Sequence, residues 1–326
     1  MVTTSLFLAV MLLSAGAAAQ QTSGTKKIVI GFSQCTVREP WRVEFNRRMK
    51  KRVEQLKNVR LDILDADDRT DRQVAQMRTF ILRRVDVILI SPKEAAGLTR
   101  VVKEAVEAGI PVVVLDRDVH FKGYDCFIGG DNKLIGRAAG NVAVDLLGGP
   151  GKATGVIYEI CGGLASTPAQ ERRAGFHEVV EKEKGIKIIG GLDADWKKDK
   201  AQVIFQNAMK ANPRIDLVYG HNDPMAHGAF QAARAAGRHE EMKFIGIDAL
   251  PDEGVRWVRA GELTATLLYP TPGEKGIDIA LKILRGEPFE KRITLGTRVF
   301  TRENVDRGGE EVKPGSGRQA RRQPLP

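Results

Sequence analysis

The stretch PVVVLDRDVHF at residues 111–121 joins a run of β-branched residues to three consecutive charged residues. Unbroken apolar runs of this kind are typical of strands that are buried in a parallel sheet. In open α/β sheets, ligands bind beyond the carboxyl ends of the parallel strands. The stretch therefore predicts a core strand that delivers Asp116 and Arg117 to a ligand. The alternative is a surface ion pair between these two residues, which would contribute little to stability.

Strand-like and helix-like segments alternate along the rest of the chain, which is typical of parallel sheets covered by helices. The first alternating unit extends to residue 115, and a second begins at residue 132. The junction between them lies near Gly129, Gly130 and Asp131. The sequence therefore predicts an α/β fold with two similar units. Strands are expected at 27–32, 61–64, 85–90, 112–115, 154–160, 186–190, 217–220, 243–248 and 263–269. Helices are expected at 44–56, 71–83, 98–108, 132–147, 169–183, 198–211, 224–236, 252–260 and 273–285.

The two ends of the chain differ from the alternating part. Residues 6–13 form an apolar segment that is too short to span a bilayer, and Ala17, Ala18 and Ala19 follow it. This pattern predicts a signal peptide over residues 1–19 and a periplasmic protein, although no Lys or Arg precedes the apolar segment. Residues 306–326 are expected to form a flexible tail because their end is rich in Gly, Pro, Gln and Arg.

Composition and charge exclude several classes of protein. The chain of 326 residues has 42% hydrophobic and 28% charged residues, as in an ordinary globular protein. The formal net charge is +10, but Lys and Arg are interspersed with acids rather than gathered in a block. No nucleic-acid partner is therefore expected. A monomer is expected.

Three cysteines, Cys35, Cys126 and Cys161, are present in a chain that is predicted to be exported. Export permits disulfides, but an odd count leaves at least one thiol free, and no two cysteines have C-x-x-C spacing. We expect the three cysteines to be buried and to pack like small hydrophobic residues. The sequence leaves open whether any two of them form a disulfide.

Each stretch that resembles a motif of an enzyme or metal site lacks a residue or a spacing that the motif requires. LLGGPGKAT at 146–154 has Leu146 and Ala153 where a phosphate loop needs Gly and Ser or Thr. In DADDRTD at 65–71, Arg69 stands where a calcium loop needs an oxygen ligand. His221 and His227 are six residues apart and do not share a helical face, so no zinc pair is expected. The sequence thus predicts no enzyme, no metal site and no cofactor.

Polar and aromatic side chains follow the predicted strand ends in both units. Carboxylates and guanidinium groups pair with sugar hydroxyls, which both donate and accept hydrogen bonds. Indole rings pack on the apolar C–H faces of a sugar. The combination predicts a site for a neutral polyhydroxyl ligand. The set is Gln34, Glu39, Trp41 and Arg42 after the first strand, Asp116 and Arg117 after the fourth, and Arg172, Trp196, Asn222 and Asp248 in the second unit.

Structural roles are open for several of these residues. The alternative for Trp41 and Trp196 is that they are aromatic residues of the core. Asn222 has the alternative of capping the helix that begins near Pro224, which is compatible with ligand binding. The alternative for Asp248 is a structural role in a turn. For Glu39 and His221 the sequence does not separate a ligand contact from a structural role.

Five stretches in order, KIVIGFSQ, PVVVLDRD, ERRAGF, HNDPMAHGA and FIGIDALPDE, resemble the periplasmic sugar-binding proteins of ABC importers. The resemblance covers about residues 26–305 and is to the type I, ribose/galactose-binding-like family. The galactofuranose-binding branch is the nearest, on GFSQ and PWR. The chain departs from the family at Arg38-Glu39-Pro40 and at Cys161-Gly-Gly, so the identity of the sugar stays open.

This resemblance implies two Rossmann-like lobes that are joined by three crossovers and close on one sugar. Lobe one would hold residues 26–129 plus 271–294, and lobe two residues 131–269 plus 295–305. The ligand would be a pentose or hexose in pyranose or furanose form, and an ABC permease would be the membrane partner. The resemblance places Asp116, Arg117, Asn222 and Asp248 on hydroxyl-binding positions, Trp196 on a stacking position, Trp41 and Arg42 in the first loop, and Tyr269 at a crossover.

A chain with this predicted fold could have one of four functions. A soluble sugar-binding protein for an importer and a sugar sensor for a chemoreceptor or histidine kinase share every feature above. A transcription regulator with this fold would need an N-terminal helix-turn-helix, where the signal peptide is predicted. An enzyme would need a positioned acid/base pair. The sequence favours the importer protein, with the sensor as the alternative.

Overall fold

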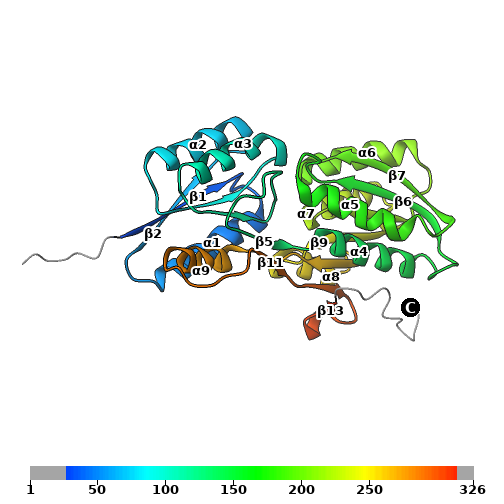
Figure 1. The fold of residues 1–326 in the computed structure, drawn as a ribbon. Helices are drawn as coiled ribbons and strands as arrows, with labels where there is room; N and C mark the ends of the chain where they lie inside the picture. Colours follow the sequence, from blue (N-terminus) through cyan, green and yellow to red (C-terminus); the bar gives the residue numbers. More distant parts are fainter. Residues whose placement is uncertain (1–26, 314–326) are drawn as a thin grey trace, which may run out of the picture.

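The computed structural model describes residues 27–313, which form one six-stranded and one seven-stranded sheet, with helices packed against both. Figure 1 shows the two sheets in two lobes that lie side by side. The predicted α/β fold is therefore confirmed. None of the helices within 27–313 is long and apolar enough to cross a membrane. The expected signal peptide at 1–19 and the last part of the expected tail lie outside the described residues.

The first sheet has the strand order β11-β5-β4-β3-β1-β2, and all its neighbours pair in parallel. We call this sheet, with its four helices, lobe one. Its strands are β1 (Ile28–Gln34), β2 (Val59–Asp65), β3 (Val87–Ser91), β4 (Val112–Leu115), β5 (Cys126–Gly130) and β11 (Arg292–Leu295). Its helices are α1 (Pro40–Glu54), α2 (Thr70–Leu82), α3 (Ala95–Glu107) and α9 (Gly273–Leu284).

Strand β4, which precedes Asp116, is buried on both faces. Val113 and Leu115 pack in the cluster that contains Phe45 of α1. Val112 and Val114 point the other way, into the cluster that contains Phe80 of α2. An unbroken apolar run is needed because neither face of the strand meets water.

The second sheet has the order β13-β12-β10-β9-β8-β6-β7, and we call it, with its helices, lobe two. Its β12 and β13 edge is antiparallel, and the rest is parallel. Its strands are β6 (Thr154–Cys161), β7 (Gly185–Asp193), β8 (Leu217–Gly220), β9 (Lys243–Asp248), β10 (Ala265–Leu268), β12 (Thr297–Thr301) and β13 (Glu310–Val312). Its helices are α4 (Asn132–Leu146), α5 (Thr167–Val180), α6 (Lys198–Ala211), α7 (Asp223–Ala235) and α8 (Arg256–Ala260), with short turns at His239–Glu241, Pro251–Val255 and Val305–Arg307.

The chain passes between the two sheets three times within the described residues. It crosses between β5 and α4, between β10 and α9, and between β11 and β12. The residue bounds of the two lobes given above stay a prediction.

Four strands were not predicted from the sequence: β5, β11, β12 and β13. They are short, and their pairing partners are distant: β5 pairs with β11, and β12 pairs with β10. The expected flexible tail also differs, because Thr297 of β12 pairs with Val312 of β13. Of the four, β11 and β13 are edge strands, which need only one partner and carry a weak apolar pattern, whereas β5 and β12 lie inside their sheets.

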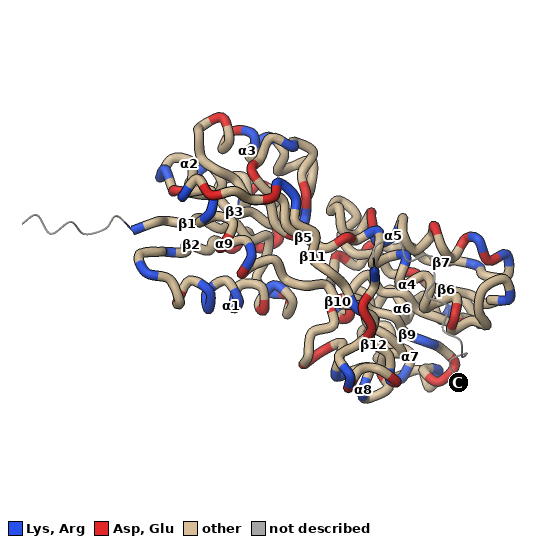
Figure 2. Tube along the Cα trace, turned by 60° about the horizontal axis from the view of Figure 1, so that its bottom comes forward, with Lys and Arg blue, Asp and Glu red and all other residues tan. Residues whose placement is uncertain are grey.

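Charged side chains are spread over both lobes, as Figure 2 shows for Lys and Arg in blue and Asp and Glu in red. Neither lobe presents charges of one sign alone in that view. This distribution agrees with the interspersed charges of the sequence.

Candidate functional site

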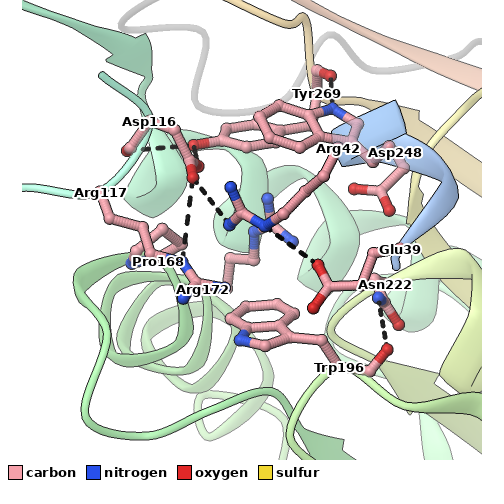
Figure 3. A pocket seen from close by; sticks show the side chains of 11 residues that line it. Glu39, Arg42, Asp116, Arg117, Pro168, Arg172, Trp196, Asn222, Asp248 and Tyr269 are labelled. Atoms are coloured by element: carbon pink, nitrogen blue, oxygen red, sulfur yellow. Dashed lines mark hydrogen bonds and ion pairs between the residues drawn. The ribbon is translucent and has the colours of Figure 1, made fainter. Parts of the chain in front are cut away.

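A pocket between the two lobes brings together ten of the eleven predicted site residues (Figure 3). The space between its lining side chains is about 290 Å³, a figure that includes open solvent. Pro168 was missed by sequence reasoning, and Gln34 does not line the pocket. The lining residues are Glu39, Trp41, Arg42, Asp116, Arg117, Pro168, Arg172, Trp196, Asn222, Asp248 and Tyr269.

The lining side chains come from the carboxyl ends of parallel strands in both sheets. Glu39 and Arg42 follow β1, and Asp116 follows β4. Asn222 follows β8, and Asp248 ends β9. Ligand sites lie at this edge because strands deliver side chains there while the loops leave room.

Asp116 is the centre of the lobe-one half of the pocket. Its Oδ2 accepts hydrogen bonds from Arg42 Nη2 at 3.0 Å and Ser91 Oγ at 2.9 Å. Its Oδ1 accepts one from the Tyr269 hydroxyl at 2.7 Å. Burial raises the pKa of Asp116, but Arg42, Arg117 and these hydroxyls outweigh it and leave the pKa below its ordinary value.

The surface ion pair considered for Asp116 and Arg117 is not present. Asp116 is 2% exposed and Arg117 is 3% exposed, so both are buried in the pocket wall. The Arg117 Nε lies 3.8 Å from Asp116, farther than Arg42, and Arg117 Nη1 donates to the Lys93 carbonyl at 3.1 Å. The cation that pairs most closely with Asp116 comes from helix α1.

Gln34 lies behind the pocket wall and contacts the pocket-lining residue Arg42. Its Oε1 accepts a hydrogen bond from Arg42 Nη1 at 2.9 Å, and its Nε2 donates to Asn46 Oδ1 at 3.1 Å. Glu39, at the start of α1, forms an ion pair with Arg42 Nε at 3.2 Å. Gln34 and Glu39 therefore hold the Arg42 guanidinium from two sides.

Aromatic rings form two opposite walls of the pocket. Trp41 stacks on Tyr269 with ring centroids 5.1 Å apart, and its Nε1 donates to the Tyr269 carbonyl at 2.7 Å. The Arg172 guanidinium lies 4.4 Å from the Tyr269 ring centroid and 5.4 Å from that of Trp196. Trp41 and Trp196 also belong to the cores of their lobes, so the core and pocket interpretations both hold.

Arg172 lies in α5 and is held by close packing against α4. A Cβ on Gly136 would lie 2.2 Å from the Arg172 carbonyl oxygen, and a Cβ on Gly175 would lie 2.1 Å from that of Lys133. Only glycine allows this approach. Arg172 Nε then donates to Asn132 Oδ1 at 2.9 Å, and its Nη1 donates to the His221 carbonyl.

Asn222 caps helix α7, as considered from the sequence. Its Oδ1 accepts from the Met225 N–H at 3.0 Å, and its Nδ2 donates to the Trp196 carbonyl at 3.1 Å. The cap therefore also fixes the loop that carries Trp196.

Asp248 is not the turn residue considered above; it ends strand β9 and is 6% exposed. Among residues 27–313 its carboxylate has no hydrogen-bonded partner. Burial raises the pKa of Asp248 well above its ordinary value, and Arg172 offsets only part of this. Next to it, burial raises the pKa of Asp223 to about 7.

Backbone strain is concentrated at this edge of the sheets. Asp116, Trp196 and Asp248 have φ values of 64°, 65° and 135°, in the region that favours glycine. Such a conformation costs about 1–3 kcal/mol for each residue and persists where the surroundings enforce it. Strained residues often mark functional sites, and here all three line the pocket.

Four charged residues form ion pairs between the two lobes, and we call them the mouth cluster: Asp68, Lys93, Asp195 and Lys197. Lys93 Nζ lies 2.6 Å from Asp68 and 2.7 Å from Asp195. Lys197 Nζ lies 2.9 Å from Asp68 and 2.6 Å from Asp195. Burial raises the pKa of Asp68, but Lys93 and Lys197 outweigh it and lower the pKa to about 2.

Backbone contacts also join the lobes near the mouth. The Ala95 N–H donates to the Ala165 carbonyl at 3.2 Å, and the Asp118 N–H donates to Thr167 Oγ1 at 3.0 Å. Together with the mouth cluster, these hydrogen bonds bring the two lobes into direct contact.

The two histidines considered as a zinc pair bind different partners. His221 Nε2 lies 3.1 Å from Glu159, and His227 Nε2 lies 2.8 Å from Glu262. His221 does not line the pocket. The three cysteines, all within the described residues, are buried and free.

Comparison with known proteins identifies the family. Residues 30–288 match the periplasmic binding protein domain. The chain is 29% identical over 279 residues to the ribose import binding protein of Salmonella typhimurium, covering 85% of this chain and 92% of that protein. It is 30% identical over 277 residues to the galactofuranose-binding protein of Escherichia coli, covering 82% and 86%.

Solved structures agree. The fructose-binding periplasmic domain of a hybrid two-component system superposes with a TM-score of 0.83 at 38% identity, over 86% of this chain and 93% of that one. The binding protein of the arabinose ABC transporter from Shewanella, bound to arabinofuranose, gives a TM-score of 0.80 at 28% identity, over 86% and 94%. The resemblance stated from five sequence stretches is thereby confirmed, and the chain belongs to the periplasmic binding protein family.

Proposed function

We propose that this protein captures a monosaccharide between its two lobes in the periplasm and delivers it to the permease of an ABC transporter. The observation that carries the proposal is the pocket itself. It combines three guanidinium groups, three carboxyl groups and an amide with two aromatic walls. A phosphate or carboxylate ligand would not need the acids, and a metal ion would not need the indoles.

The chemistry of each wall fits a sugar. The Asp116 carboxylate would accept hydrogen bonds from hydroxyls, and the guanidinium groups of Arg117 and Arg172 would donate to them. The ring of Trp196 offers an apolar face to the C–H side of the sugar. The furanose form is included in the proposal because one relative is named for galactofuranose and a solved relative holds arabinofuranose.

Closure supplies the signal that a permease would recognise. A ligand that contacts both lobes shifts the open–closed equilibrium only by its difference in affinity for the two states. Asp116 and Arg117 lie in lobe one, and Trp196 and Asn222 lie in lobe two, so a bridging ligand favours the closed state. A permease that binds closed protein would then receive loaded protein.

The experiment is a thermal-shift screen of pentoses and hexoses in pyranose and furanose forms, followed by small-angle X-ray scattering with each hit. Ligand at about a hundred times its dissociation constant should add about 2.7 kcal/mol of stability. The radius of gyration should fall in the same titration. A sugar that raises the melting temperature strongly but leaves the radius unchanged would refute the clamp.

A sensor function is the second candidate. The solved relative with 38% identity is a periplasmic domain of a hybrid two-component system. Sugar uptake by cells that lack this gene distinguishes the two: the importer role requires that uptake falls, and a sensor role requires that uptake capacity persists while the response to the sugar is lost.

We further propose that the protein does not turn over its ligand. The relatives above are named as binding proteins. Recovery of the unchanged sugar after prolonged incubation with the protein is expected. A released product would contradict the proposal.

A further inference from the structure

A second cluster of polar side chains lies in lobe two, outside the sugar pocket. Glu159 and Cys161 end strand β6, His177 lies on α5, and His221 follows β8. Glu159, Cys161 and His221 are each 0% exposed. None of these four residues lines the pocket between the lobes. We call them the Glu159 cluster.

The donor atoms of this cluster converge. Glu159 Oε1 lies 3.1 Å from His221 Nε2, and Glu159 Oε2 lies 3.0 Å from His177 Nε2. One ligand atom each from Glu159, Cys161 and His221 lies within 4.8 Å of the others. Donors around a tetrahedral zinc ion are separated by about 3.3–3.8 Å, given Zn–N of about 2.0 Å and Zn–S of about 2.3 Å. Small shifts of these three side chains would therefore suffice, and His177 would join them from the other side of Glu159, which its Nε2 contacts.

The chemistry of the donor set is selective. A thiolate, a carboxylate and two imidazoles are the ligands that zinc takes in proteins. One thiolate and one carboxylate also supply two negative charges, which the ion would share with the Arg173 guanidinium 3.7 Å from Glu159. A network that served only to pair Glu159 with two histidines would not need a sulfur beside it.

A second shell already orients one of the imidazoles. Glu181 Oε1 lies 2.8 Å from His177 Nδ1, on the ring edge opposite to Glu159. A carboxylate that holds one nitrogen of a histidine and leaves the other for the metal is the usual arrangement at zinc sites. Arg173 Nη1 lies 3.6 Å from Cys161 Sγ and donates to the sulfur.

A separate pocket reaches the His177 side of the cluster, where the side chain is partly exposed. This pocket, with about 560 Å³ of empty space, is lined by Glu159, Arg173, His177 and Glu181, with apolar residues of β7 around them. It shares no residue with the sugar pocket. A metal ion could therefore enter whether or not the lobes are closed.

We propose that Glu159, Cys161, His177 and His221 form a binding site for one zinc ion. The site lies directly behind the sugar pocket, because Asn222 follows His221 in the chain and Arg172 donates to the His221 carbonyl. Bound zinc would tie the ends of β6 and β8 to α5 and so fix the lobe-two wall.

Cobalt titration of the chelator-treated full chain is the test, since Co²⁺ replaces Zn²⁺ and is visible. One equivalent should produce a thiolate-to-cobalt charge-transfer band and the strong d–d absorption of tetrahedral Co²⁺. Adding Zn²⁺ should remove both. Cys161→Ala should abolish the charge-transfer band, whereas Cys126→Ala, a matched change of another buried free thiol, should keep it.

A milder variant guards against misfolding. His177 is 21% exposed at its side chain, so His177→Gln should fold, and it should bind Co²⁺ at least tenfold more weakly. Glu181→Gln should weaken binding by about tenfold through the orientation of His177. Absence of saturable Co²⁺ absorption in the wild type, or a charge-transfer band that survives Cys161→Ala, would overturn the proposal. Neither outcome decides the proposed sugar binding, which the thermal-shift screen tests by itself.

Discussion

The two halves of the sugar pocket are organised differently. In the lobe-one half, polar groups already bind one another: Asp116 holds Arg42, Ser91 and Tyr269, and Gln34 holds Arg42 from behind. In the lobe-two half, polar groups are held mainly through backbone contacts, and the indole N–H of Trp196 has no hydrogen-bond partner. Lobe one thus offers a preassembled anchor, and lobe two offers polar groups that remain available to a ligand.

The pKa values of two aspartates, one in each half, shift in opposite directions. Arg42 and Arg117 hold the pKa of Asp116 below its ordinary value, despite burial. Burial raises the pKa of Asp248 well above its ordinary value. One carboxyl group is therefore held as a charged acceptor, and the other is held toward its protonated form, in which it can donate. A sugar hydroxyl can pair with either, but in opposite roles.

The largest effect is expected from Asp116→Asn. The substitution keeps the shape but removes the charge from a buried network, so Arg42 loses its closest charged partner. Sugar affinity should fall by about 1.5–3 kcal/mol, or roughly 10- to 150-fold, by calorimetry. Asp118→Asn is the matched control, because Asp118 is buried in the same lobe but does not line the pocket. Equal losses of affinity for both variants would show that Asp116 contributes no more to sugar binding than a buried carboxylate outside the pocket.

The next effect is expected from Trp196 on the other wall. Trp196→Ala should weaken sugar binding by about tenfold and Trp196→Phe by about threefold, because a phenyl ring keeps part of the stacking surface. Trp257→Phe, a buried indole of lobe two outside the pocket, should leave the affinity unchanged. Equal losses for Ala and Phe would point instead to the indole N–H as the group that meets the ligand.

Asp248→Asn and Asp116→Asn should respond to pH in opposite directions. A raised folded pKa means that Asp248 contributes stability below the ordinary value of about 3.9, and that this is lost as the pH rises through the folded pKa. Asp116, with a lowered pKa, contributes stability above about 3.9 that is lost as the pH falls through its folded pKa.

Melting temperatures across pH measure this difference. Asp248→Asn should gain on the wild type as the pH rises above about 4, whereas the deficit of Asp116→Asn should shrink as the pH falls below about 4. Parallel curves for the two variants would contradict the assignment of charge to the two halves.

The smallest effect is expected at the mouth cluster. Lys93→Ala removes one of two cations that join Asp68 to Asp195, and sugar affinity should fall by about two- to fivefold at low salt. The difference should vanish near 1 M salt, where the screening length is about 3 Å. Lys103→Ala, on an exposed pair with Glu107 in the same lobe, is the control. A loss that persists at high salt would mean that Lys93 acts by packing rather than by charge.

Much of the fold was predictable because periodicity and strand ends are local features. The buried run before Asp116 and the cap at Asn222 both lie within a few residues of what they explain. Pro168 was missed because a proline in the first turn of a helix reads only as a helix start. Gln34 was placed in the pocket because it ends β1, but its side chain turns to Arg42.

The sequence by itself determined which residues stand at the carboxyl edge of the sheets, since apolar runs that end in polar residues specify strands and their exits. Only the tertiary structure decided that Asp116 pairs most closely with Arg42 rather than its neighbour Arg117. It also decided that the pKa of Asp116 is lowered and that of Asp248 raised. Finally, it brought Glu159, Cys161 and His221 together, with His177 in contact with Glu159. These properties depend on burial and on distances between residues far apart in the chain. Both are set by how the sheets and helices pack, and neither is written in any local pattern.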